Sequence, residues 1–359
     1  MSTKELLLLL AAALVVVALA YFIAPQKGPT RQISYERCMN ISGKPTLFSS
    51  GPLSIVSTDS PGIDTYAIME NGSIAWSMEL PGRATAASWW NDKVAIGTDS
   101  GYLLVIGKDG SLLSKKKFLG EVQFLSWSEG GRLAVVTRVV EDGREMAMLQ
   151  LPRRMKLGGY VTYLGWANGS LIVMVEDEGA GLRIIGRGGL TSRSIRGRVL
   201  GIRRGSIAIS TDGKVALVDV DGRKVAELDV EASTGCWLND ELYIGGKNGL
   251  YSYKGSLRRL IKGNVVEIAC LKRVAAAIEA NGTWFVYVDG KLFEVRGRPF
   301  HLQWDSSGEN VAFSIQSAEP QTGIIGEELT SLEGSFVGWV GEEVAVYRGG
   351  RLCLISPRP

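Results

Sequence analysis

A repeat of 33 to 42 residues runs through most of the chain and constrains its fold more than any other feature. Each unit reads as an apolar strand ending in Trp, a tight turn, an aliphatic strand, a Gly-rich or acidic turn, and further short strands, as in residues 84–116, 122–151 and 161–189. Because the spacing is regular, we expect the Trp side chains to pack between units. The recurring position holds Phe48, Trp90, Trp127, Trp166, Ile202, Trp237, Leu271, Trp304 and Trp339.

A unit of this length holds four strands of about five or six residues joined by tight turns, the blade of a β-propeller. Gly, at 45 of 359 residues, suits many such turns. Nine positions are counted, whereas propellers usually have four to eight blades. The sequence therefore predicts an all-β propeller of eight or nine four-stranded blades. The last unit ends after three strands, and we expect residues 32–38 to complete it and close the ring, which removes a free sheet edge.

Two segments resemble repeats of the PQQ-like propellers, which include quinoprotein dehydrogenases and the outer-membrane assembly lipoprotein propeller. They are VAIGTDSGYLLVIGKDGSLLSKK (residues 94–116) and YAIMENGSIAWSMELPG (residues 66–82), with Trp76 at the position of the Trp that closes such repeats. LQWDSSGENVAFSI (residues 302–315) is more similar to a strand pair of WD-repeat or Tol-type propellers. The resemblance covers residues 32–359 and implies the architecture, whereas propellers host many unrelated functions.

The N-terminus carries an unbroken apolar run at residues 6–24, which Pro25 ends. At a rise of about 1.5 Å per residue, this run nearly spans a hydrocarbon core of about 30 Å. We expect a short tail at 1–5, a transmembrane signal anchor at 6–24, a linker at 25–31 and the propeller at 32–359. A signal peptide cleaved after Ala18-Leu19-Ala20 is the alternative, but the run is longer than a usual signal-peptide core of about 7–15 residues.

Two features indicate that the propeller lies on the extracytoplasmic side of the cell membrane. Four of the nine Asn residues lie in N-x-Ser/Thr sequons, which mark surface loops of secreted glycoproteins. Three of these are also Asn-Gly pairs, which favour hairpin turns. The four cysteines are consistent with an oxidising compartment. The candidate glycosylation sites are Asn40, Asn71, Asn168 and Asn281.

The cysteines fall into two pairs with different expectations. If the N-terminal strand pairs with the strand at 351–353, Cys38 and Cys353 face each other, and we expect a ring-closing disulfide. Cys236 and Cys270 fall at equivalent positions of consecutive units. Stacked sheets lie about 10 Å apart, whereas a disulfide needs Cα atoms within about 7 Å. We therefore expect these two residues to be buried thiols and not a bridge.

Acidic residues gather in the turns between the second and third strands, which share one face of a propeller. Converging carboxylates there could bind Ca²⁺ or a basic partner, although no Asp-x-Asp-x-Asp-Gly loop is present and solvated turn acids are the alternative. The candidate partner-binding residues are Asp59, Asp64, Glu141, Asp142, Glu145, Glu176, Asp177, Glu178 and Glu319.

Motifs of common catalytic sites are missing from the sequence. There is no Gly-x-Ser-x-Gly, no His-Glu-x-x-His and no P-loop, and His301 is the single His. There is no vicinal Cys pair, and most units lack the closing Trp, which disfavours a PQQ cofactor. A net charge of +3 does not indicate a nucleic-acid partner. We expect a membrane-anchored scaffold that binds a protein or glycan; a propeller hydrolase or lyase using loop carboxylates or a PQQ-like redox protein are the alternatives.

Overall fold

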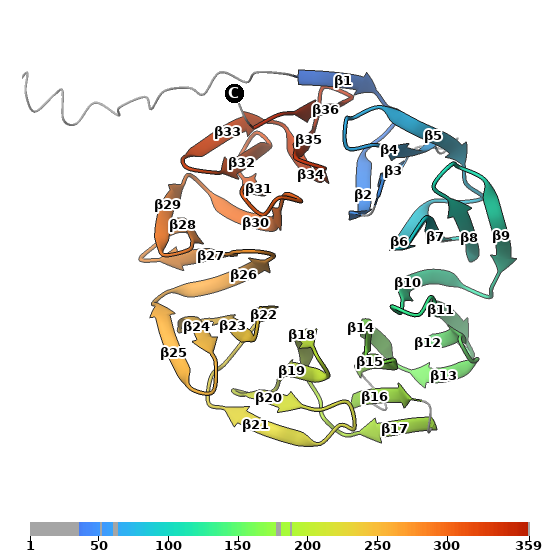
Figure 1. Cartoon of the computed structure of the whole chain (residues 1–359), viewed down its shortest axis with the longest axis horizontal. Coiled ribbons are helices and arrows are strands. Elements are labelled where there is room, and N and C mark those ends of the chain that lie inside the picture. The colour runs from blue at the N-terminus through green and yellow to red at the C-terminus, as the bar shows by residue number, and fades with distance from the viewer. Residues whose placement is uncertain (1–35, 51, 60–63, 177–180, 187–188, 358–359) are drawn as a thin grey trace, which may run out of the picture. The chain divides into compact units, whose positions relative to one another are not determined.

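Nine four-stranded antiparallel sheets form a ring of blades (Figure 1). The computed structural model describes residues 36–50, 52–59, 64–176, 181–186 and 189–357. The prediction of a propeller with eight or nine blades is confirmed, with nine blades. The predicted span at 6–24, with its tail and linker, lies outside the described residues. Among the residues that are described, no helix is long and apolar enough to cross a membrane.

The strands of blades 1 to 3 follow one another along the chain. Blade 1 contains β2 (Pro45–Ser50), β3 (Ser54–Thr58), β4 (Asp64–Ile68) and β5 (Ile74–Glu79). Blade 2 contains β6 (Ala84–Trp90), β7 (Lys93–Thr98), β8 (Tyr102–Gly107) and β9 (Leu112–Lys117). Blade 3 contains β10 (Glu121–Trp127), β11 (Leu133–Glu141), β12 (Arg144–Leu151) and β13 (Met155–Gly158).

Blades 4 to 6 repeat the same order. Blade 4 contains β14 (Tyr160–Ala167), β15 (Ser170–Glu176), β16 (Gly181–Gly186) and β17 (Gly189–Arg193). Blade 5 contains β18 (Arg198–Arg203), β19 (Ser206–Ser210), β20 (Val215–Val218) and β21 (Lys224–Leu228). Blade 6 contains β22 (Thr234–Leu238), β23 (Glu241–Gly246), β24 (Gly249–Tyr253) and β25 (Leu257–Ile261).

The last three blades lead back to the first. Blade 7 contains β26 (Asn264–Cys270), β27 (Val274–Ala280), β28 (Thr283–Val288) and β29 (Lys291–Val295). Blade 8 contains β30 (Arg298–Trp304), β31 (Val311–Gln316), β32 (Gln321–Ile325) and β33 (Leu329–Glu333). Blade 9 contains β34 (Ser335–Val340), β35 (Glu343–Arg348), β36 (Arg351–Ile355) and β1 (Glu36–Asn40).

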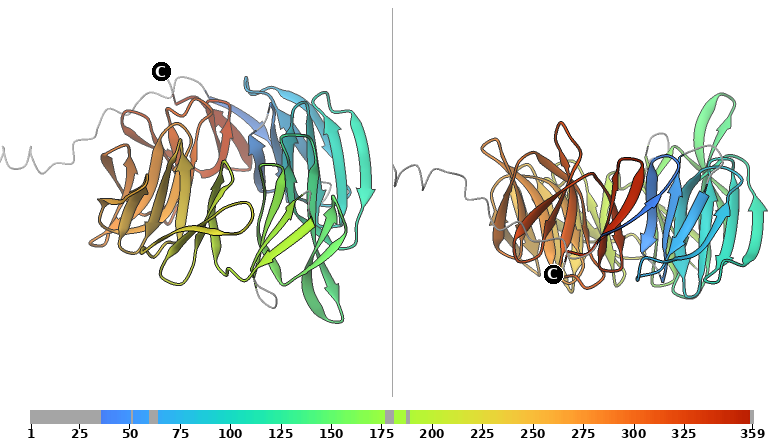
Figure 2. Two further views of the ribbon diagram at one scale, coloured as in Figure 1. Left: turned by 60° about the horizontal axis from the view of Figure 1, so that its bottom comes forward. Right: turned by 90° about the horizontal axis from the view of Figure 1, so that it is seen from above.

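The burial pattern follows the order of strands within a blade. Second strands such as β15 are buried at nearly every position, because both of their faces pack against neighbouring blades, which explains the aliphatic runs in the sequence. The outermost strand β9 is exposed at all six positions and ends in three lysines, a common protection of a free sheet edge. Figure 2 shows the blades side by side, with strands running between the two ends of the ring.

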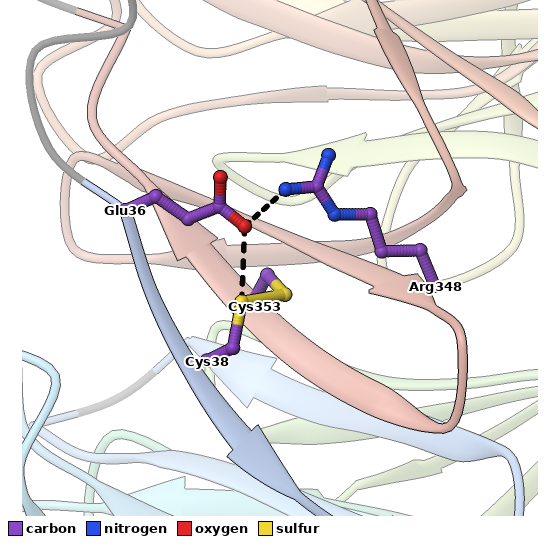
Figure 3. The surroundings of a disulfide bond; sticks show 4 residues. All are labelled: Glu36, Cys38, Arg348 and Cys353. Atoms are coloured by element: carbon purple, nitrogen blue, oxygen red, sulfur yellow. Dashed lines mark hydrogen bonds and ion pairs between the residues drawn. A yellow bond between two sulfur atoms is a disulfide. The ribbon is translucent and has the colours of Figure 1, made fainter.

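The ring closes where the two ends of the described chain pair. Strand β1 is antiparallel to β36, with Cys38 opposite Cys353, and these two residues form a disulfide with Cα atoms 4.0 Å apart. The Glu36 carboxylate accepts a hydrogen bond from Arg348 beside this disulfide (Figure 3). Arg37 forms an ion pair of 2.8 Å with Glu343 of the same blade. Main-chain pairing, a disulfide and ion pairs therefore hold β1 to blade 9, although its partner strand lies more than 300 residues away in the sequence.

One side chain from each innermost strand fills the junction with the preceding blade. Each of the nine hydrophobic clusters spans one junction and contains one of these residues, which define what we call the inter-blade position. In blade order they are Leu47, Trp89, Trp127, Trp166, Ile202, Trp237, Cys270, Trp304 and Trp339. The predicted packing of Trp between blades is therefore observed at six junctions.

For three blades, the residue predicted from the sequence for this position is wrong by one residue. Trp90 lies beyond Trp89 and donates from Nε1 to the Glu129 carbonyl in the next blade. Phe48 packs towards blade 2, and Leu271 follows β26 with an exposed side chain. Successive side chains of a strand point to opposite faces, so an error of one residue exchanges a core position for a position on the other face.

A hydrogen bond accompanies the Trp packing at four junctions. The indole Nε1 of Trp127, Trp166, Trp304 and Trp339 donates to a main-chain carbonyl of the preceding blade at 2.9 to 3.1 Å. The acceptors of the last three are Ser126, Ala269 and Gln303, each directly before the inter-blade residue of its own blade. Each inter-blade residue therefore contacts the preceding blade at one fixed place. That place is the residue directly before the inter-blade residue of the preceding blade.

The same geometry produces the second disulfide, between Cys236 and Cys270. Cys270 occupies the inter-blade position of blade 7, whereas Cys236 directly precedes Trp237 in blade 6. Their Cα atoms lie 6.0 Å apart, so the prediction of two separate buried thiols is wrong. The spacing of about 10 Å between stacked sheets does not apply to these residues, because the innermost strands of adjacent blades converge towards the ring axis. The two cysteines are also not equivalent, because Cys270 is the inter-blade residue of its blade and Cys236 precedes the inter-blade residue of its own.

Candidate functional site

A pocket of about 560 Å³ opens at one end of the ring, where blades 7, 8, 9 and 1 meet. We call this the first-turn end, because it carries the turns between first and second strands, such as residues 271–273 and 305–310. Four consecutive inter-blade residues line the pocket: Cys270, Trp304, Trp339 and Leu47. Volumes of 300–1,000 Å³ are typical of small-ligand sites, and the volume of this pocket falls within that range.

The Trp series is interrupted in two of the four blades that line the pocket. At most junctions a Trp fills the space beside the innermost strand, but blade 7 has Cys270 and blade 1 has Leu47. Both side chains are smaller than an indole, and they flank the two Trp residues of blades 8 and 9. Leu47 therefore leaves more room than an indole at the junction of blades 9 and 1, which borders the pocket. Cys270 faces the junction of blades 6 and 7, and no described residue of blade 6 lines the pocket.

Hydrogen bonds fix the walls of the pocket. Trp304 and Trp339 are held by their bonds to the carbonyls of Ala269 and Gln303, at 3.0 and 2.9 Å. The Ser54 hydroxyl of blade 1 donates to the Trp339 carbonyl at 3.4 Å. Walls that are already fixed lose little conformational freedom when a ligand binds, which favours affinity.

The lining is apolar at its base and acidic at its rim. Leu53, Ile68 and Leu302 supply buried or nearly buried apolar surface, and Leu271 is 47% exposed beside them. Glu70 lies at the rim with an exposed side chain. Among the described residues that line the pocket there is no Lys, Arg or His. The pocket therefore suits an apolar group that is followed by a positive charge.

Asp305 also lines the pocket, but its carboxylate serves the turn that it begins. It accepts hydrogen bonds from the Ser307 hydroxyl, the Glu309 main-chain amide and the Asn310 side chain, at 2.9, 3.0 and 2.7 Å. The side chain is completely buried, and a buried carboxylate needs such donors. Asp305 thus stabilises the turn that shapes one wall.

The single histidine lies on the innermost strand of blade 8. His301 has a positive φ of 60°, and its main-chain amide donates to the Glu267 carboxylate at 2.6 Å, as does that of Leu302 at 3.0 Å. Its ring nitrogen Nε2 lies 2.8 Å from the Gln303 amide. Glu267 therefore holds an irregular stretch of β30 to blade 7, a structural use of this carboxylate.

The predicted acidic loops lie at the opposite end of the ring, and several of their carboxylates have local partners. Glu141 pairs with Lys156 at 2.7 Å, and Glu145 pairs with Arg138 at 3.6 Å. Arg138 also binds Glu121, which raises the pKa of its guanidinium. Asp59 accepts a hydrogen bond from the Lys44 amide at 2.6 Å. These acids are used within their own blades.

The remaining acidic candidates are dispersed over separate turns. Asp142 sits in a turn with a positive φ of 53°, and Glu176 and Glu319 are exposed. Asp64 begins β4, and Asp177 and Glu178 lie outside the described residues. In the described part of the chain, three potential metal ligands converge at Glu36, Cys38 and Cys353, whose cysteines form the disulfide. The Ca²⁺ site in the acidic loops stays a prediction.

The four sequon asparagines are exposed in the structure. Asn168 and Asn281 adopt positive φ values of 45° and 54° in Asn-Gly turns, the conformation that two-residue hairpins require. Asn71 caps its turn, because its side-chain oxygen accepts hydrogen bonds from the Ser73 amide and hydroxyl at 3.0 and 2.7 Å. Turn geometry therefore accounts for Asn71, Asn168 and Asn281, whereas Asn40 ends β1. Glycosylation of all four stays a prediction.

Sequence comparisons find no matching family model and no matching curated protein. Similar solved structures do exist. The computationally designed Ika8 protein has a TM-score of 0.54 at 14% identity, over 82% of this chain and 97% of that chain. BamB from Moraxella catarrhalis has a TM-score of 0.48 at 11% identity, over 90% and 98%. At such identities the likeness to the Ika8 protein concerns the fold alone. The β-propeller itself follows from the nine sheets of the described residues.

Proposed function

We propose that this chain is a membrane-anchored propeller on the extracytoplasmic side, where it acts as a scaffold that binds a protein through the first-turn end. The apolar run at 6–24 is the basis of the proposed anchor. The pairing of all four cysteines in two disulfides supports an oxidising compartment, because disulfides are rare where thiol reductants act.

The pocket is the observation that carries the binding role. It combines fixed aromatic walls, an apolar base and an acidic rim. Partly exposed apolar surface with a polar rim is typical of interaction sites, and aromatic anchor pockets dominate many protein interfaces. Two smaller pockets towards the opposite end, of about 330 and 280 Å³, have no aromatic residue in their lining. We therefore assign recognition to the first-turn end.

Cross-linking in membranes tests this proposal. The full-length chain is produced in its own host, membranes are treated with an amine- and carboxyl-reactive cross-linker, and linked peptides are identified by mass spectrometry. We expect the chain to sediment with membranes and to link to one other protein from turns at the first-turn end. A matched variant without residues 6–24 should be released from the membrane. Links within the propeller alone would contradict the scaffold role.

A further inference from the structure

The turns at the first-turn end divide into an acidic sector and a nearly neutral one. In blades 7, 8, 9 and 1 the described turns carry seven acids against Lys272 and Arg273, a net charge of −5. The acids are Asp289, Asp305, Glu309, Glu327, Glu328, Glu342 and Glu70. In blades 2 to 6 the described turns carry six acids and seven basic residues, a net charge of +1. The pocket therefore opens within the acidic sector.

One of the two basic residues in the acidic sector, Arg273, forms contacts within that sector. Arg273 binds Asp289 at 2.6 Å, donates to the Glu309 carbonyl at 3.3 Å, and its guanidinium carbon lies 5.5 Å from the Trp304 ring centre. Arg273 therefore supports the wall of the pocket from behind. Glu70, in contrast, lies at the opening with its carboxylate exposed.

We propose that the pocket binds a basic segment of a protein partner, in which one large apolar side chain enters between Cys270 and Leu47 while a neighbouring Lys or Arg pairs with Glu70. This inference rests on the proposed protein-binding role and adds the chemistry of the partner. The apolar base stabilises the bound side chain by removing its apolar surface from water. The acidic sector attracts a positively charged segment and disfavours an acidic one.

A variant that fills the pocket provides the test. Leu47→Trp places an indole at the inter-blade position of blade 1, where Gly338 of blade 9 leaves space, as Gly201 does for Trp237. Ile202→Trp is the matched control, because it makes the same kind of change at the junction of blades 4 and 5, away from the pocket. Glu70→Lys reverses the charge at an exposed position and leaves the core unchanged.

A random dodecapeptide library displayed on phage serves as the probe, with the disulfide-intact propeller immobilised. We expect enriched peptides with an aromatic or large aliphatic residue within two positions of Lys or Arg. Synthetic copies should bind the unchanged chain and the Ile202→Trp variant equally, but lose tenfold or more in affinity for Leu47→Trp and severalfold for Glu70→Lys. Raising the salt concentration should weaken binding.

Thermal unfolding establishes whether each variant is folded. If Leu47→Trp does not fold, the affinity of the Glu70→Lys variant still decides the test. Absence of enrichment, enrichment of acidic peptides, or equal affinity for Leu47→Trp and Ile202→Trp would overturn the proposal. Cross-linking could also identify a protein partner that binds the Leu47→Trp and Glu70→Lys variants as well as it binds the unchanged chain. That result would overturn the proposal and leave the scaffold role intact. Absence of any partner would instead remove the scaffold role.

Discussion

Cys270 meets Cys236 across the junction of blades 6 and 7 in the same relation in which Trp166 meets Ser126 across the junction of blades 3 and 4. In both pairs an inter-blade residue contacts the residue that precedes its counterpart in the preceding blade. A covalent bond thus stands where other junctions have an indole packed over a carbonyl. Cys270 also lines the pocket, so this position of the repeat joins two blades and borders the candidate site.

Removal of this disulfide should destabilise the propeller. For a loop of 34 residues, the Cys236→Ser, Cys270→Ser double variant is expected to lose about 3–4 kcal/mol in the free energy of unfolding. The Cys236→Ser, Cys270→Trp double variant recreates the Ser126–Trp166 pair and should recover part of this loss. Denaturant unfolding of the three proteins measures it. Equal stability of both double variants would contradict the equivalence of the positions.

The number of free thiols should be zero in the native protein. Because both cysteine pairs are bonded, alkylation of the denatured chain without reductant should leave the intact mass unchanged, and four alkyl groups should add after reduction. Intact mass spectrometry makes the distinction. Two modified thiols without reductant would mean that one of the disulfides is absent.

Loss of an indole hydrogen bond should cost more at the inter-blade position, where the bond is partly buried, than at Trp90, whose bond to the next blade is exposed. Trp166→Phe leaves the Ser126 carbonyl without its donor and is expected to lower the free energy of unfolding by about 1–3 kcal/mol. Trp90→Phe is the control, since Trp90 lies outside the inter-blade series, and a change of less than about 1 kcal/mol is expected there. Chemical denaturation of both variants compares them. A larger effect at Trp90 would contradict the corrected register.

The outer edge of blade 5 should lose a stabilising contact in acid. Lys214 and Lys224 donate hydrogen bonds to the Glu227 carboxylate, both at 2.6 Å, and lower the pKa of Glu227 to about 2. A carboxyl with a lowered pKa stabilises the fold above its ordinary value of 4.5, and the effect is lost as the pH falls from there to about 2. The difference in thermal midpoint between the unchanged chain and Glu227→Gln should therefore shrink from pH 7 to pH 2.

Salt offers a control for these two ion pairs, because Lys214, Lys224 and Glu227 are all exposed to solvent. Added salt at pH 7 should reduce the same difference in thermal midpoint, because the charges are screened. A direct carboxyl titration by NMR measures the pKa. An ordinary value of Glu227 would show that the two lysines do not act on it.

Local patterns in the sequence were sufficient for the architecture. Alternating and aliphatic strands of five or six residues, broken by Gly and Asn-Gly turns, specify a blade through contacts between neighbouring segments. Repetition of that pattern predicts a ring of eight or nine blades, and the structure has nine. Pairing of β1 with β36 followed from the incomplete last unit. For the same reason, the positions of Cys38 and Cys353 could be predicted as neighbours.

Tertiary structure decided the features that depend on one-residue register and on distance between blades. In a strand, moving by one residue turns a side chain to the opposite face, so Leu271 and Phe48 could not be distinguished from Cys270 and Leu47 by spacing alone. The curvature of the ring brings innermost strands close enough for Cys236 and Cys270 to bond. It also gathers four inter-blade residues, separated by most of the chain, around one pocket. The sequence by itself determined the blade, and the closed ring determined what each blade presents to the next.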